Sequence, residues 1–249
     1  MIRFFRKIRF KQFGEKKISR YLIYALGEIL ITVLGILIAI QINNWNQQRL
    51  AEIKINRLLV EIQNNLEDEI QSARYGIEIY NYKDSLLTRI MQGDVTRDEF
   101  KLSPTIRGRN QSPQYATSVY YSGYSLNRNA YNNLVQISDR IPDKYIDLFN
   151  KVTYLYEDVD GWVNQREGKL LDNYYQCQNY FRDNKEFLSD LWTEKPMDDN
   201  AIDFFMNDPI YRNWIHVMHH YFMEHQKSII EFEEVASQVR NQILGLELN

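Results

Sequence analysis

The sequence predicts an all-α protein in which one N-terminal transmembrane helix continues into a long helix that joins an antiparallel helical bundle. Three observations lead to this prediction. Residues 21–42 form an unbroken apolar run, and the segments that follow repeat apolar residues at heptad spacing. All five prolines come after position 103, so nothing interrupts long helices in the first part of the chain.

The apolar run reads YLIYALGEILITVLGILIAIQI, and Glu28 is its one acidic or basic residue. At about 1.5 Å per residue, such a helix reaches roughly 33 Å, enough to cross a hydrocarbon core of about 30 Å. A cleaved signal peptide is the alternative, but its apolar region is normally roughly 7–15 residues long and precedes a small-residue cleavage site. Residues 40–44, which follow Ala39, read IQINN and offer no such site. A retained signal anchor is therefore predicted.

The charges around this run predict its orientation. Residues 1–20 carry eight basic side chains and one acid, a net +7, so the remaining residues sum to −10. The positive-inside rule places such an N-terminus in the cytoplasm and the rest of the chain outside it. Phenylalanines alternate with the bases, which is typical of an amphipathic tail on the inner leaflet. The membrane-surface candidates are Arg3, Arg6, Lys7, Arg9 and Lys11. Because the body is acidic, no nucleic-acid partner is expected.

Two features inside the run are candidate contacts with a partner in the membrane. Glu28 lies about two turns from the cytoplasmic end, where a carboxyl group is costly. It can bind a partner helix, relay protons, or reach back toward the interface and Arg20. A stripe of residues at spacing four lets a second helix approach closely, which predicts self-association. Its members are Gly27, Ile31, Gly35 and Ala39.

The remaining chain divides into a stalk, residues 43–92, and a helical bundle domain, residues 93–249. The stalk predicts one long helix to about Gln92, with Asp84 as the one break in its apolar seam. Residues 93–126 predict a loop, rich in glycine, proline and polar groups. Within the bundle we expect a short helix over 127–139 and longer helices from Pro142 to Phe181 and over 211–243, with a less regular stretch before the last.

The polar residues of the bundle do not form a recognisable catalytic site. His216 and His220 share one helical face with Glu224, so a two-histidine metal site would need a further ligand from another helix. The simpler interpretation is a solvated face, with His225 pointing into the apolar seam. Cys177 also falls on a seam, as a buried apolar residue would. Nucleotide-binding, hydrolase and zinc-protease motifs are absent, so we expect no metal, no cofactor and no enzymatic activity.

The N-terminal third, IRFFRKIR followed by SRYLIYALGEILITVLGILIAIQINNWNQQR, is similar to a family of single-pass proteins of Bacteroidota that carry a domain of unknown function. The likeness rests on a basic start, a Gly-Glu pair in the span and a QINNWN-type exit, and becomes loose beyond about residue 50. It implies a Gram-negative inner membrane and a periplasmic body, but no activity. It also implies that the membrane exit is important, through Gln41, Asn43, Asn44 and Trp45.

Together these features favour a non-enzymatic scaffold or accessory subunit that presents a periplasmic bundle. Its expected partners are the lipid bilayer and either a second copy of the chain or another membrane protein. Two alternatives remain open at this point: a periplasmic sensor or ligand-binding module, and a helper of an ion-driven membrane machine that uses Glu28.

Overall fold

The structure, a computed structural model, describes residues 15–101, 126–187 and 197–246. The all-α prediction is confirmed, since every regular element among these residues is helical. The chain divides into two compact units, Met1–Lys54 and Ile55–Asn249. Residues 55–92, most of the predicted stalk, therefore belong to the same unit as the bundle.

The first unit contains the apolar part of helix α2, which runs from Glu15 to Gln92. Among the described residues, α2 is the one helix long and apolar enough to cross a membrane, judged by length and composition, and none of its apolar stretch is buried within the protein. The membrane-surface candidates of the N-terminal tail lie outside the described residues.

Helix α2 ends where the sequence predicted, because Gly93 adopts a left-handed conformation with φ 72°. The amide of Gly93 donates to the carbonyl of Ile90 and that of Asp94 to the carbonyl of Arg89, which satisfies the last carbonyls of the helix. Glycine adopts this backbone conformation at no steric cost.

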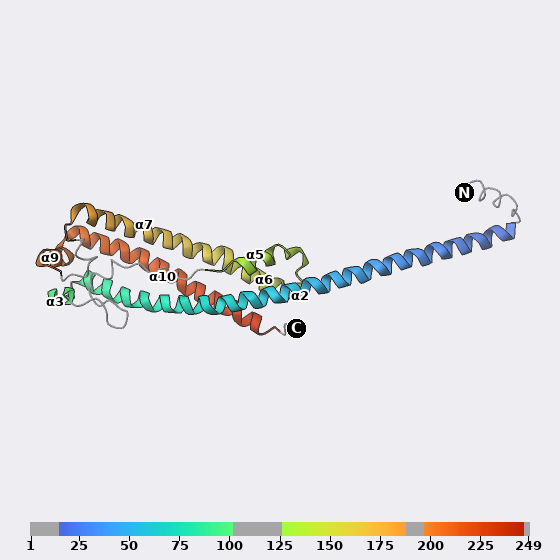
Figure 1. Cartoon of the computed structure of the whole chain (residues 1–249), viewed down its shortest axis with the longest axis horizontal. Helices are drawn as coiled ribbons and strands as arrows, with labels where there is room; N and C mark the ends of the chain where they lie inside the picture. Colours follow the sequence, from blue (N-terminus) through green and yellow to red (C-terminus); the bar gives the residue numbers. More distant parts are fainter. Residues whose placement is uncertain (1–14, 102–125, 188–196, 247–249) are drawn as a thin grey trace. The chain divides into compact units, whose positions relative to one another are not determined.

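In the second unit, α10 (Pro209–Leu244) packs along residues 55–92 of α2, for example through Tyr80 and His225, and α7 (Asp160–Asn184) packs along α10 (Figure 1). Helix α10 runs antiparallel to α2. Helix α7 runs in the same direction as α2, because the elements that precede it pack near Ile55, where this part of α2 begins.

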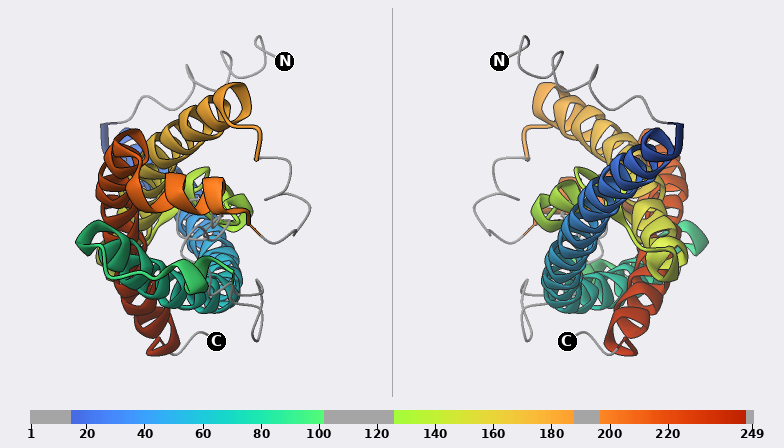
Figure 2. Two further views of the ribbon diagram at one scale, coloured as in Figure 1. Left: turned by 90° about the vertical axis from the view of Figure 1, so that its left-hand side faces the viewer. Right: turned by 90° about the vertical axis from the view of Figure 1, so that its right-hand side faces the viewer.

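Short elements connect the long helices. They are α3 (Arg97–Phe100), α5 (Asn129–Val135), η1 (Ser138–Arg140), η2 (Asp143–Tyr145), α6 (Ile146–Thr153) and α9 (Asp199–Asn207). Helix α9 lies across one end of the bundle (Figure 2) and contacts α3 through Arg97, which bonds Asp199 at 2.9 Å and also bonds Asp203. Neither α3 nor α9 was predicted. The rest of the predicted 93–126 loop falls mostly outside the described residues.

The interior of this unit consists of two hydrophobic clusters stacked along the three long helices. The first includes Leu66, Val159 and Phe232, and the second includes Leu87, Phe181 and Tyr211. Between them, α10 carries the buried polar residues His225, Gln226 and Ser228. The bundle is thus apolar at both ends and polar at its middle.

One turn before α7 is wider than an α-helical turn. Residues Tyr154–Val159, labelled η3, form a π-helix, and the amide of Asp160 donates to the carbonyl of Leu155, five residues back. The sequence predicted one uniform helix across this region. π-Helical turns are rare and are frequent at functional sites.

Candidate functional site

The helical geometry of α2 gathers most of the intramembrane candidates on one face. At roughly 100° per residue, Gly35 and Ala39 both lie within roughly 20° of Glu28 around the helix axis. Gly27 lies roughly 100° away, at the edge of this face. We call Glu28, Gly35 and Ala39 the small-residue face.

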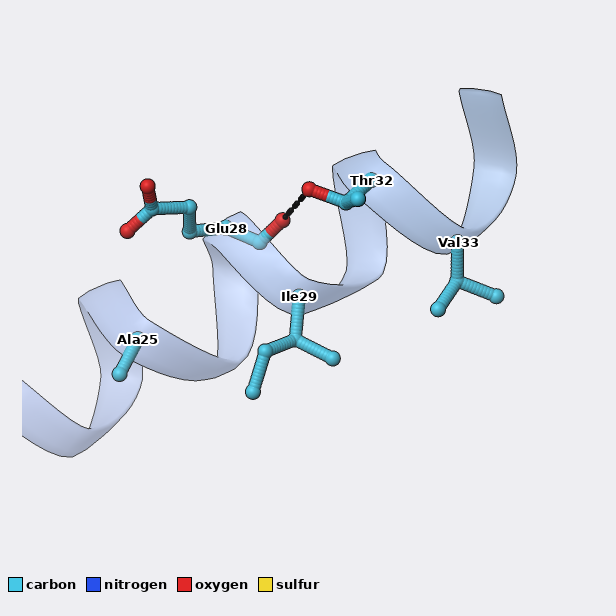
Figure 3. A pocket seen from close by; sticks show the side chains of 5 residues that line it. All are labelled: Ala25, Glu28, Ile29, Thr32 and Val33. Atoms are coloured by element: carbon cyan, nitrogen blue, oxygen red, sulfur yellow. Dashed lines mark hydrogen bonds between the residues drawn. The ribbon is translucent and has the colours of Figure 1, made fainter. Parts of the chain in front are cut away.

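Glu28 also borders a shallow hollow on α2, whose lining is shown in Figure 3 and consists of Ala25, Glu28, Ile29, Thr32 and Val33. The hydroxyl of Thr32 donates to the backbone carbonyl of Glu28 at 2.8 Å, so it is satisfied within its own helix. The carboxylate of Glu28 extends away from the helix and away from Thr32 (Figure 3). It is therefore the polar group that this face offers to a neighbour.

The glycines of this region are not required by contacts within the chain. A Cβ atom placed on Gly27 or Gly35 would meet nothing within 4 Å. Small residues that no contact of their own chain requires leave room for another helix to approach closely.

The predicted membrane-exit residues all lie on α2 with exposed side chains, and the helix continues through them without a break. They are Gln41, Asn43, Asn44 and Trp45. Trp45 is 63% exposed.

The structure does not assemble a metal site from the histidines. His216 and His220 are exposed, and within the described residues no group of three potential ligands could hold a metal ion. Instead, Nε2 of His219 lies 2.6 Å from Oδ1 of Asp84, the residue that breaks the α2 seam. His225 is fully buried, as its register predicted. Cys177 is buried too, and burial raises its pKa to about 12, which makes it a poor nucleophile.

A charged cluster around Arg128 was not predicted. One guanidinium nitrogen donates to the carbonyl of Tyr156 at 2.6 Å and to Oδ2 of Asp160 at 2.8 Å, and the other donates to Oε1 of Glu157 at 2.7 Å. The guanidinium also lies over the ring of Tyr131, which stacks on Tyr156. Because Tyr156 sits in the π-helical turn, Arg128 ties α5 to this unusual turn.

A second unpredicted group lies between the two hydrophobic clusters. Oη of Tyr80 lies 2.5 Å from Nδ1 of His225, and Gln226 donates to Asn81 at 2.7 Å. Lys83 is fully buried, 5.6 Å from the ring centre of Phe222, and burial lowers its pKa to about 7. Lys83 lies three residues after Tyr80 and four before Leu87, two members of the apolar seam of α2. This spacing places Lys83 on the buried face and could have predicted its burial.

The fold and these sites define an all-α protein that has, in the part of the chain that the structure describes, one candidate membrane-crossing helix and a bundle with a polar middle. No family model, curated protein or solved structure matches this chain.

Proposed function

We propose that this protein is a non-enzymatic scaffold or accessory subunit that α2 anchors in a membrane and docks to a partner through the small-residue face. One observation carries the proposal. A carboxyl group and two small residues share one narrow face of a helix whose other positions are mainly large and apolar, and none of that apolar stretch is buried within the protein.

The physical argument starts from the cost of a carboxyl group in hydrocarbon. Polar side chains within a membrane segment are costly, and they are generally turned toward another helix or a wet cavity. A partner helix that donates a hydrogen bond to Glu28 would relieve this cost. The positions 28, 32, 35 and 39 alternate steps of four and three, which is the spacing of left-handed helix pairs. Glycine and alanine at two of these positions allow close contact.

The proposal also includes the orientation of the chain in the membrane and the compartment of the bundle. Eight basic residues before the apolar run favour a cytoplasmic N-terminus. The resemblance of the N-terminal third to single-pass proteins of Bacteroidota adds to the proposal that the membrane is the inner membrane and that the bundle lies in the periplasm. Protease treatment of spheroplasts tests this orientation. Digestion of the bundle only after the outer membrane is opened supports it, whereas digestion only after lysis of the inner membrane contradicts it.

The partner is identified by affinity purification of the full chain in a mild detergent followed by mass spectrometry. Glu28→Gln is compared with Leu37→Ala, because Leu37 lies roughly 180° from Glu28 on the same helix. We expect a co-purifying membrane protein, or a second copy of the chain, that is lost in the Glu28 variant alone. If an unrelated span replaces residues 21–42 and every partner is retained, the proposal is wrong.

A helper of an ion-driven machine would use the same carboxyl group differently, by exchanging a proton. In that case Glu28→Asp should retain function and Glu28→Gln should abolish it, while both variants still bind the partner. Loss of binding in Glu28→Gln favours docking instead.

A further inference from the structure

A second carboxyl group, that of Glu69 on α2, binds the backbone just before α5. Its Oε1 accepts the backbone amide of Asn127 at 2.8 Å, the residue two before α5 begins. Its Oε2 is buried and has no hydrogen-bond partner among the described residues. The whole residue is 7% exposed. A carboxylate in this position would have one oxygen removed from water without compensation, which is costly.

The cation that follows this contact in the sequence is already paired. Arg128 comes directly after Asn127, but its two terminal nitrogens bond Asp160 and Glu157. Ionised Glu69 would add a negative charge near Asp160, which is itself buried.

The other elements that face this part of α2 do not supply a free positive charge from the described residues. On α2 itself, Asp68 adds to the repulsion. Tyr156 of η3 contributes a buried phenol whose pKa is raised by burial and by Glu69. On the turns of α2 before and after Glu69, the α10 side chains are already paired. These pairs are Arg240 with Glu67 and Glu233 with Arg74.

We propose that Glu69 is a proton-operated latch: when protonated it holds Asn127 and Arg128 against α2, and when it ionises this attachment loosens. Protonation removes the repulsion from Asp160 and leaves a neutral carboxyl group in the buried position, where it costs less than a carboxylate. Ionisation strengthens the acceptor for the Asn127 amide, but it places a second negative charge beside Asp160 in a buried position. Local opening would then let the carboxylate reach water.

These opposing effects place the pKa of Glu69 in the neutral range. Burial raises the pKa of Glu69 to about 7, the Asn127 amide opposes the rise, and Asp160 and Asp68 add to it. The latch would therefore respond to ordinary changes of ambient pH. It does not depend on the docking role of α2.

Hydrogen exchange of the full chain in detergent, followed by mass spectrometry, tests the latch. After correction for the intrinsic pH dependence of exchange, protection of residues 127–135 should fall on the order of tenfold or more from about pH 5.5 to about pH 8.5. Glu69→Gln should keep the protected state at both pH values. Glu61→Gln, at an exposed position of α2, should behave as wild type.

Two results would overturn the proposal: protection in the wild type that does not change with pH, or the same pH response in Glu69→Gln. If Glu69→Gln does not fold, infrared spectroscopy of the wild type remains decisive. Loss of a buried protonated carboxyl signal near neutral pH supports the latch, and absence of that signal at about pH 5.5 refutes it.

Discussion

Oη of Tyr80 lies 2.5 Å from Nδ1 of His225, and this pair joins α2 to α10 between the two hydrophobic clusters. Both side chains are fully buried. Within the described residues, Nε2 of His225 has no hydrogen-bond partner, so the contact with Tyr80 is its main polar compensation.

Tyr80→Phe removes only the hydroxyl and leaves the histidine without this bond. Because a buried polar group without a partner is costly, we expect the free energy of unfolding to fall by about 1–3 kcal/mol. Urea denaturation of the full chain in detergent measures it. Tyr175→Phe, at a residue that is 58% exposed, is the control and should change stability by less than about 0.5 kcal/mol. Equal effects of the two substitutions would contradict the importance of the pair.

His225 and Glu69 should make opposite contributions to the pH dependence of stability. Burial, with a smaller effect of Arg166, lowers the pKa of His225 from 6.5 to about 4. Between these values the unfolded chain binds more protons, so the His225 contribution rises with pH. The pKa of Glu69 is raised from 4.5 to about 7, so in that range the folded chain binds more protons and the contribution falls as pH rises.

The two effects overlap between about pH 4.5 and 6.5, where each can reach about 1.4 kcal/mol per pH unit and the two largely cancel. In Glu69→Gln, unfolding free energy should therefore rise with pH more steeply than in wild type. In His225→Gln it should rise less steeply or fall. Urea titrations at several pH values compare the slopes, and equal slopes in all three proteins would show that neither group titrates as described.

Lys83 should destabilise the folded protein at pH values where its buried amine is protonated. Burial lowers the pKa of this amine from 10.5 to about 7. Between these values the unfolded chain binds more protons, so the free energy of unfolding rises with pH, and the destabilisation by Lys83 is largest below about pH 7. Lys83→Met keeps an unbranched apolar side chain and should raise the unfolding free energy at about pH 6 on the order of 3 kcal/mol. Lys169→Met, at an exposed position of α7, is the matched control. No difference between these variants would contradict the prediction.

A larger side chain at position 35 should leave the fold of the chain unchanged but prevent close contact with a partner helix. Gly35→Ile meets nothing within 4 Å of its Cβ, so the helix content of the purified protein should be unchanged. The added side chain would separate the small-residue face from a partner helix, and co-purification should fall to the level of Glu28→Gln. Circular dichroism and affinity purification measure the two effects. Retained binding would exclude this face as the docking surface.

The long helices could be predicted from the sequence because each has a local signal. Helix α10 has a regular apolar seam, and its start is marked by Asp208, whose side chain accepts the amides of Ile210 and Tyr211, with Pro209 in the first position. The end of α2 is marked by Gly93. Helix α9 was missed although Asp198 caps it, because nine residues are too few to establish a periodicity.

The polar sites of the bundle could not be predicted, because their partners are distant in sequence. Glu69 meets the amide of Asn127, and Tyr80 meets His225, across long stretches of chain. Lys83 was overlooked for a different reason. Charged residues are expected at the surface, so its place in the apolar seam of α2 was not taken as a sign of burial, although the structure shows that it is buried.

The π-helical turn at Tyr154–Val159 is the place in this segment where the length of the chain can change. Such a turn accommodates one extra residue, so deleting one residue there would restore an α-helical turn and leave the later residues of α7 in nearly the same orientation. Deleting one residue in the regular part of α7 before Leu170 would instead rotate the residues that follow by roughly 100° about the helix axis, and Cys177 and Phe181 would leave the second hydrophobic cluster. A functional homologue with a regular helix at this point should therefore be one residue shorter here, and single-residue gaps between related chains should be confined to this turn and its immediate neighbourhood.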